Sequence, residues 1–247
     1  MKTKKIVGIL LENLKTLIGA IIIAILIRSL IVQPFYIPSS SMEPTLLVGD
    51  RIFVTKYTYG YSKHSFPFSP NFSKSRFFSK KPEQGDLVVF KTPADNRTDY
   101  IKRLIGLPGD EIQFIDGEIL INGKKIQRTL TTSKQIIRCG GYSLNSNIFL
   151  ETLPNGAQHF TSYNKEGTLK NTKKYIVPSD HYFLMGDNRD CSKDSRFLDD
   201  VGYVKHLNLV GKAKIIFFSN DTQSGSLLKF WNLKNSFRLK RTFKGLK

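Results

Sequence analysis

The chain has 247 residues, of which 38 are Lys or Arg and 20 are Asp or Glu, so its formal net charge is +18. This length accommodates one β domain, or at most two smaller ones, with a proper core. A hydrophobic content of 40% excludes a wholly disordered chain, and two cysteines exclude a disulfide-dense scaffold or a Cys-rich zinc module. The positive charge fits nucleic acid or an anionic lipid surface equally well.

An apolar segment lies near the N-terminus. Over 16–37 its only charge is Arg28, and its 22 residues would span roughly 33 Å as a helix, enough for the core of a bilayer. The apolar side chains outweigh the cost of one arginine, about 2.5 to 3.5 kcal/mol, placed toward one end. We therefore predict a single transmembrane anchor over 16–37, after a cytoplasmic N-terminus over 1–15.

The flanking charges predict the orientation of this anchor. Four lysines precede the apolar run, whereas 33–48 contains no Lys or Arg. By the positive-inside rule, the N-terminus stays in the cytoplasm and the remainder is exported. A cleaved signal peptide is the alternative, with a cleavage site at the serines 39–41, but the arginine and the prolines that follow the run disfavour it.

The exported part, 38–228, is predicted to be a mainly β domain. Apolar, β-branched runs at 86–90 and 214–218 are typical of strands. The segment 111–126 alternates and carries an Asp-Gly and an Asn-Gly turn, which predict a three-strand meander. The segment 61–81 is rich in Ser, Phe, Pro and Lys and is predicted to be an irregular loop.

Three short segments carry residue types found in catalytic sites: PSSSMEPTL at 38–46, DYIKRLIGLPGD at 99–110 and GDNRDCSKDSR at 186–196. Taken alone, each has a plain alternative: a polar loop, a strand lysine that reaches water, and a tight polar turn. The third segment lacks the spacing and the terminal Glu of a calcium-binding loop, so we predict no metal.

In this order behind one anchor, the segments closely resemble those of bacterial type I signal peptidases (leader peptidases), over nearly the whole chain. The resemblance implies a membrane-bound serine endopeptidase that cleaves signal peptides from exported preproteins after a small-x-small motif. It implies a mostly β catalytic core with a β-rich insertion, here 111–177. The expected location is the outer face of the bacterial cytoplasmic (inner) membrane. Signal peptides and the bilayer are the expected partners, with no cofactor, no nucleic acid and no obligate protein partner.

The resemblance also implies roles for individual residues. Ser41 matches the nucleophile and Lys102 matches its general base. Ser39 matches the hydroxyl that helps to form the oxyanion hole, and Ser192 matches the serine that orients the lysine. A supporting ion pair and a turn that shapes the site complete the set, namely Asp194 with Arg196, and Gly186 with Asp187.

The chemistry of a lysine base agrees with the sequence around Lys102. A lysine with a pKa of about 10.4 is protonated at neutral pH, and lowering that pKa to 7 or 8 requires roughly 3 to 4 kcal/mol, which apolar burial can supply. The flanking IKRLI sequence is suitably apolar. Among four histidines, only His181 lies close to the third segment, and an ordinary surface role is favoured for it over a Ser-His-Asp triad.

The cysteines and the C-terminal tail are open features of the sequence. We predict that Cys139 and Cys191 are free thiols. The tail, 229–247, has seven Lys or Arg residues and no acid, with Phe230 and Leu233 at near-helical spacing. It is either a solvated basic tail or an amphipathic segment that rests on anionic lipid.

Two other functions remain possible at this stage. A self-cleaving Ser/Lys regulatory protease would need an N-terminal DNA-binding module where this chain has its apolar segment. A non-enzymatic, basic, membrane-anchored binding protein would explain the charge but leave the three segments unexplained.

Overall fold

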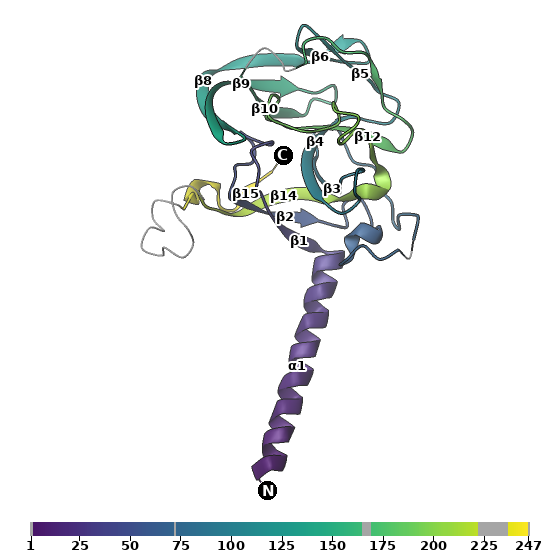
Figure 1. Cartoon of the computed structure of the whole chain (residues 1–247), viewed down its shortest axis with the longest axis vertical. Helices are drawn as coiled ribbons and strands as arrows, with labels where there is room; N and C mark the ends of the chain where they lie inside the picture. Colours follow the sequence, from purple (N-terminus) through teal and green to yellow (C-terminus); the bar gives the residue numbers. More distant parts are fainter. Residues whose placement is uncertain (1, 72, 165–168, 222–236, 247) are drawn as a thin grey trace.

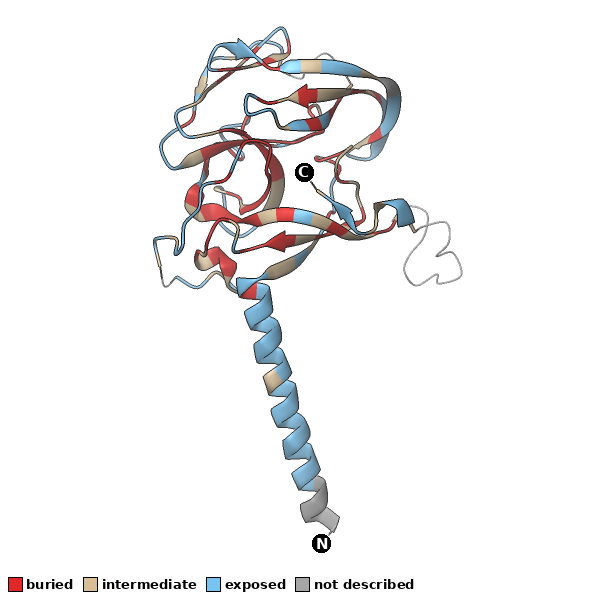
Figure 2. Ribbon diagram, turned by 180° about the vertical axis from the view of Figure 1, so that it is seen from behind, coloured by how far each residue is buried: buried red, intermediate tan, exposed pale blue. Residues whose placement is uncertain are grey.

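The computed structural model describes residues 2–71, 73–164, 169–221 and 237–246, and in it one long helix projects from a β domain (Figure 1). The helix, α1 (Lys2–Leu30), is apolar enough to cross a bilayer over Val7–Leu30, with a mean hydropathy of 2.1. Nearly all of its described side chains are exposed (Figure 2). A strongly apolar helix whose described side chains are nearly all exposed is suited to lipid.

The helix ends earlier than the predicted anchor 16–37. Strand β1 (Val32–Tyr36) follows at once and pairs antiparallel with β2 (Asp50–Thr55). The apolar run continues into this strand, and hydropathy alone does not separate a helix from an edge strand. Pro34 fits the edge position of β1, because proline cannot donate a ladder hydrogen bond.

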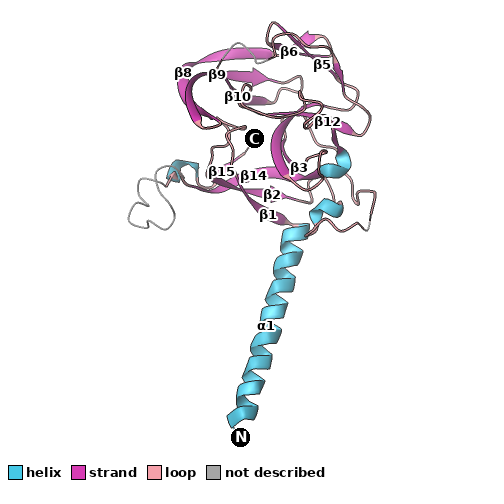
Figure 3. Ribbon diagram, viewed as in Figure 1, coloured by secondary structure: helices cyan, strands magenta, loops and turns pink. Residues whose placement is uncertain are grey.

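The main sheet has eight strands within the described residues, in the order β1-β2-β14-β3-β4-β12-β13, with β15 also paired to β14. Figure 3 shows that strands make up most of the domain above the helix. Beyond β1 and β2, the strands of the main sheet are β3 (Leu87–Lys91), β4 (Asp99–Gly106), β12 (His181–Met185), β13 (Val204–Lys205), β14 (Leu209–Ser219) and β15 (Lys244–Gly245). In the described residues, three single-turn 3-10 helices accompany these strands: η1 (Lys63–Ser65), η2 (His206–Asn208) and η4 (Leu239–Arg241). The predicted strands at 86–90 and 214–218 are therefore confirmed.

Two smaller sheets come from the segment between β4 and β12. One has the order β11-β5-β6-β7, from β5 (Glu111–Ile115), β6 (Glu118–Ile121), β7 (Lys124–Lys125) and β11 (Tyr175–Ile176). The other has the order β10-β9-β8, from β8 (Gln127–Cys139), β9 (Tyr142–Thr152) and β10 (Gln158–Tyr163). The predicted meander over 111–126 is confirmed, and Asp116 and Asn122 have the positive φ angles that its turns require.

The segment 61–81 is mostly irregular, as predicted, apart from η1 and a bridge between Tyr61 and Phe77. In the tail, Phe230 and Leu233 lie outside the described residues. Over 237–246 the chain packs on the domain through η4 and β15, so this part is not a free solvated tail.

Candidate active site

Ser41 lies on a turn that follows β1. Met42, the next residue, is fully buried in the core beneath the main sheet, as is Leu46, whose N–H donates to the Met42 carbonyl. Met42 and Leu46 anchor the turn in the core, and the Ser41 side chain remains partly exposed to solvent. The sequence pattern of a serine followed by a large apolar residue thus holds a hydroxyl at the surface of a rigid core.

Lys102 lies in β4, where it pairs with Val88 of the neighbouring strand. Its side chain is only 3% exposed, and the ammonium lies 5.6 Å from the ring centre of Tyr100 on the same face. On its other side, β4 pairs with β12, which ends at Met185. The segment that begins at Gly186 therefore starts beside the lysine strand.

The two predicted catalytic residues are in contact. Lys102 Nζ lies 2.5 Å from Ser41 Oγ, although the residues are 61 positions apart in the chain. Burial lowers the pKa of Lys102 to about 8, and the charges of Asp194 and Arg196 act on it in opposite directions. At a pKa of about 8, roughly a tenth of the lysine is neutral at pH 7, so it can accept the serine proton.

Asp194 and Arg196 form a buried ion pair at 2.7 Å and support the loop after β12. Asp194 also accepts a hydrogen bond from the Gly186 backbone, and Arg196 donates to the Arg189 carbonyl at 2.7 Å. Gly186 has to be glycine, because a Cβ there would overlap the Ser192 side chain and the Ser41 carbonyl oxygen. The glycine thus lets this loop approach the serine turn closely.

Asp187 takes part in a second buried ion pair that the sequence reasoning missed. Both of its carboxylate oxygens accept from Arg103, each at 2.7 Å, and one also accepts from the Thr45 hydroxyl at 2.5 Å. Burial opposes ionisation, but the Arg103 guanidinium holds the pKa of Asp187 below its usual range. Arg103 directly follows Lys102 in the sequence, and this position next to the predicted base was the signal that could have pointed to the ion pair.

Ser39 and Ser192 lie near the dyad without bonding to it in this structure. Ser39 is exposed two residues before Ser41. Ser192 is 7% exposed, and its hydroxyl has no hydrogen-bond partner within the described residues. The expected bond between Ser192 and Lys102 is therefore not made here, although the serine lies against Gly186, close to the serine turn.

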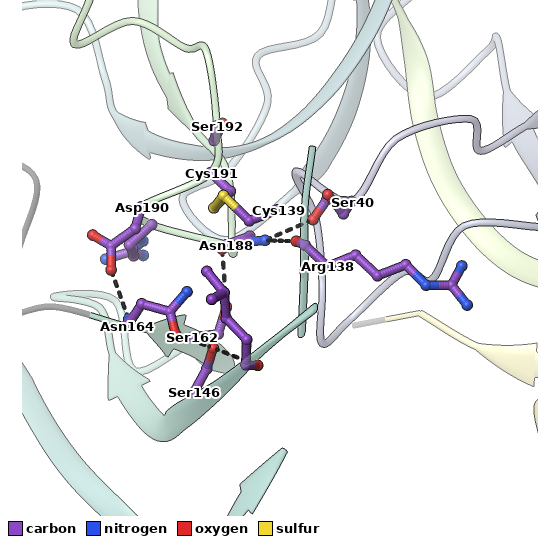
Figure 4. The surroundings of a disulfide bond; sticks show 12 residues. Ser40, Arg138, Cys139, Ser146, Ser162, Asn164, Asn188, Asp190, Cys191 and Ser192 are labelled. Atoms are coloured by element: carbon purple, nitrogen blue, oxygen red, sulfur yellow. Dashed lines mark hydrogen bonds between the residues drawn. A yellow bond between two sulfur atoms is a disulfide. The ribbon is translucent and has the colours of Figure 1, made fainter. Parts of the chain in front are cut away.

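The prediction of two free thiols is wrong. Cys139, at the end of β8, and Cys191, next to Ser192, form a disulfide with Cα atoms 5.4 Å apart (Figure 4). The freedom expected of the loop near the site favoured free thiols, but the end of β8, 52 positions away in the chain, lies against this loop. Asn188 supports the same junction by donating to the Ser40 and Arg138 carbonyls at 3.1 and 2.9 Å.

A cavity of about 710 Å³ opens at the dyad. It is lined by the serine turn, by 98–102 and, at the disulfide, by Cys191. Its apolar walls include Phe35, Ile52 and Val89. Because residues of β1 and β4 line it, the cavity can accommodate a peptide in an extended conformation.

The histidines lie in other environments. His64, His159 and His206 are buried, with pKa values lowered by burial, and His181 bonds to the Ser179 carbonyl. Ser41 Oγ has Lys102 as its only hydrogen-bond partner among the residues that the structure describes. A lysine rather than a histidine therefore contacts the serine.

Comparison with known proteins decides the family. The family described as signal peptidase, peptidase S26, matches residues 10–218. The chain belongs to this family. A signal peptidase I of Rickettsia typhi is 45% identical over 92% of this chain and 90% of its own length, and one of Rickettsia akari is 44% identical over 92% and 89%.

The family and the enzyme class predicted from the sequence are confirmed, as is the mainly β fold with one N-terminal apolar helix. As a signal peptidase, the chain is a membrane serine endopeptidase. A crystal structure of a signal peptidase I from Enterococcus faecalis is also similar, at 26% identity and a TM-score of 0.32, covering 54% of this chain and 97% of that one.

Proposed function

We propose that the chain cleaves signal peptides from exported preproteins with Ser41 as nucleophile and Lys102 as general base. The hydrogen bond between the two side chains carries this proposal. A serine hydroxyl is a poor nucleophile until a neighbour accepts its proton. The buried lysine, with its pKa lowered to about 8, is a suitable neighbour.

The reaction follows from this contact. Neutral Lys102 accepts the Ser41 proton while Oγ attacks the carbonyl carbon of the scissile bond. The tetrahedral intermediate collapses, and Lys102 gives the proton to the departing amine. Lys102 then accepts a proton from the water that attacks the acyl-enzyme. As this second intermediate collapses, Lys102 returns the proton to Ser41 Oγ, and the signal peptide leaves with a free carboxylate. The lysine thus acts as base and acid in turn.

Groups for the developing oxyanion are available on the serine turn. The backbone N–H of Ser41 has no hydrogen-bond partner within the described part of the chain, and the Ser39 hydroxyl is exposed two residues earlier. One donor of an oxyanion hole contributes about 3 to 4 kcal/mol to the stabilisation of a transition state. We assign Ser192 to holding Lys102 when the lysine carries the proton, since its free hydroxyl is buried beside the serine turn.

The substrate is proposed to add as an extended strand along the 710 Å³ cavity and to present a small-x-small motif at Ser41. We propose that α1 spans the bacterial inner membrane with its N-terminus in the cytoplasm, because the lysines precede the apolar run. The β domain that follows α1, with its insertion 111–177, then faces the outer side.

Cleavage of a preprotein by the purified full-length chain in detergent tests this function. The wild type is expected to release the mature protein, with its new N-terminus after a small-x-small motif. Ser41→Ala and Lys102→Met should each reduce cleavage by several orders of magnitude. His181→Ala is the control and should cleave normally. No cleavage by the wild type would refute the function, and substantial cleavage by Lys102→Met would refute the dyad.

A further inference from the structure

A second cavity, of about 400 Å³, lies where α1 meets the β domain. Arg28 in the last turn of the helix lines it, together with part of the 61–81 loop and the segment around Arg97 between β3 and β4. Tyr61 ties the loop to the helix, because its hydroxyl donates to the Leu30 carbonyl at 2.9 Å. The cavity is therefore fixed at the point where the apolar helix ends.

The charges that line this cavity are mainly positive. Arg28, Lys91 and Arg97 contribute three cations, and Asp99 contributes the only acid. Asp99 pairs with Lys91 at 2.9 Å. Arg28 and Arg97 have no acidic partner among the described residues, which leaves a net charge of about +2 facing the cavity.

His64 also lines the cavity, and one of its ring nitrogens has no partner among the described residues. His64 is 4% exposed, and its Nε2 makes no hydrogen bond within the described residues, whereas Nδ1 lies 3.0 Å from the Ser69 hydroxyl. The imidazole is neutral at pH 7, since burial lowers its pKa to about 4. When Nδ1 accepts a hydrogen bond from the Ser69 hydroxyl, Nε2 carries the ring hydrogen and can donate a hydrogen bond to an acceptor oxygen.

The loop beside the cavity exposes large apolar side chains. Phe68 is fully exposed, and Phe78 is 83% exposed. In Figure 1 the loop, in blue, lies beside the upper end of α1. Aromatic side chains next to the end of an apolar helix are suited to the boundary between headgroups and acyl chains.

We propose that this cavity binds the phosphate of an anionic phospholipid headgroup. Arg28 and Arg97 supply the charge, His64 Nε2 donates a hydrogen bond, and Phe68 reaches toward the acyl chains. The lipid is favoured over free phosphate because Arg28 ends an apolar helix of bilayer length, at headgroup depth. This inference rests on the membrane-spanning role proposed for α1.

Native mass spectrometry of the full-length chain in detergent, titrated with phosphatidylglycerol, phosphatidylcholine or inorganic phosphate, tests the proposal. We expect retained adducts with phosphatidylglycerol in clear preference to phosphatidylcholine. The double variant Arg28→Gln/Arg97→Gln should bind phosphatidylglycerol about 30-fold more weakly, roughly fivefold for each cation near an anionic lipid. The matched control, Lys124→Gln/Lys205→Gln, removes two exposed cations elsewhere and should bind as the wild type does.

Each other result contradicts the proposal. Equal binding of the two lipids, or unchanged binding by the arginine variant, would show that the cavity is not a headgroup site. Inorganic phosphate that binds as tightly, with the same dependence on Arg28 and Arg97, would refute the lipid as the source. Cleavage of a peptide substrate should be unchanged in both variants and reports folding. Resistance of the wild type to carbonate extraction tests the anchor separately, so failure of the anchor and failure of the headgroup site give different results.

Discussion

Lys102 Nζ and Ser41 Oγ lie 2.5 Å apart at the surface of a core that almost completely covers the lysine. The serine comes from a turn after β1 and the lysine from a strand on the other side of β3 and β14 in the sheet. Their contact therefore depends on the tertiary fold rather than on any local motif. It also gives the lysine both the environment and the position that a base needs.

The pH dependence of cleavage should follow the Lys102 pKa. Burial lowers this pKa to about 8, so the neutral, reactive form increases as pH rises. We expect kcat/KM to rise about tenfold per pH unit below 8 and to level off above it. Rates of peptide cleavage measured between pH 5 and pH 9.5 check this, and a flat profile over pH 6 to 8 would contradict a lysine base.

Gly186→Ala should impair catalysis more than folding. The new methyl group would push the Ser192 side chain and the Ser41 turn apart, and a displacement of about 1 Å at a reacting group can cost on the order of 100-fold in rate. We expect a loss of this size in kcat, measured with a peptide substrate. Gly245→Ala is the matched control, because its added methyl group would contact nothing within 4 Å. Equal rates in the two variants would show that the close approach is unimportant.

Asp187→Asn should destabilise the domain. The change leaves Arg103 buried without its carboxylate, and removing one partner of a buried ion pair typically costs about 3 to 5 kcal/mol. Chemical denaturation followed by circular dichroism measures the free energy of unfolding. Asp199→Asn, at an exposed aspartate, should leave it within about 0.5 kcal/mol of the wild type. A similar small change for Asp187→Asn would mean that the pair does not support the fold.

Loss of the disulfide should lower stability and loosen the loop beside Ser192. For a loop closed over 52 residues, the chain-entropy estimate is about 4 kcal/mol. The wild type in reductant and the Cys139→Ser/Cys191→Ser variant should therefore unfold at a similarly lower denaturant concentration. If reductant left the midpoint of the wild type unchanged, the bridge would not contribute to stability.

Local patterns in the sequence predicted much of this molecule. The Asp-Gly and Asn-Gly turns gave the meander over 111–126, because these dipeptides tolerate the positive φ angles of tight hairpins. The dyad came from a resemblance in three segments, and its contact is found in the structure. The resemblance to a family thus paired Ser41 with Lys102, which no local sequence pattern relates.

The missed features depend on contacts between distant segments. The helix ends at Leu30 because the next residues form β1 and pair with β2. The apolar run continues through this boundary, so the sequence alone does not show it. Arg103 points to the opposite face of β4 from its neighbour Lys102, and its partner Asp187 lies 84 positions away. The disulfide was missed for the same reason, because Cys139 at the end of β8 and Cys191 in the loop after β12 come together only in the folded chain.

The bridge between Cys139 and Cys191 also constrains when the enzyme matures. Thiols in the cytoplasm are kept reduced, and disulfides persist in oxidising compartments. With the domain exported as proposed, the newly made chain crosses the membrane with both thiols reduced, and the disulfide forms only after export. The loop that carries Ser192 then acquires its final rigidity on the side where preproteins emerge, so the protease and its substrates would mature in the same place.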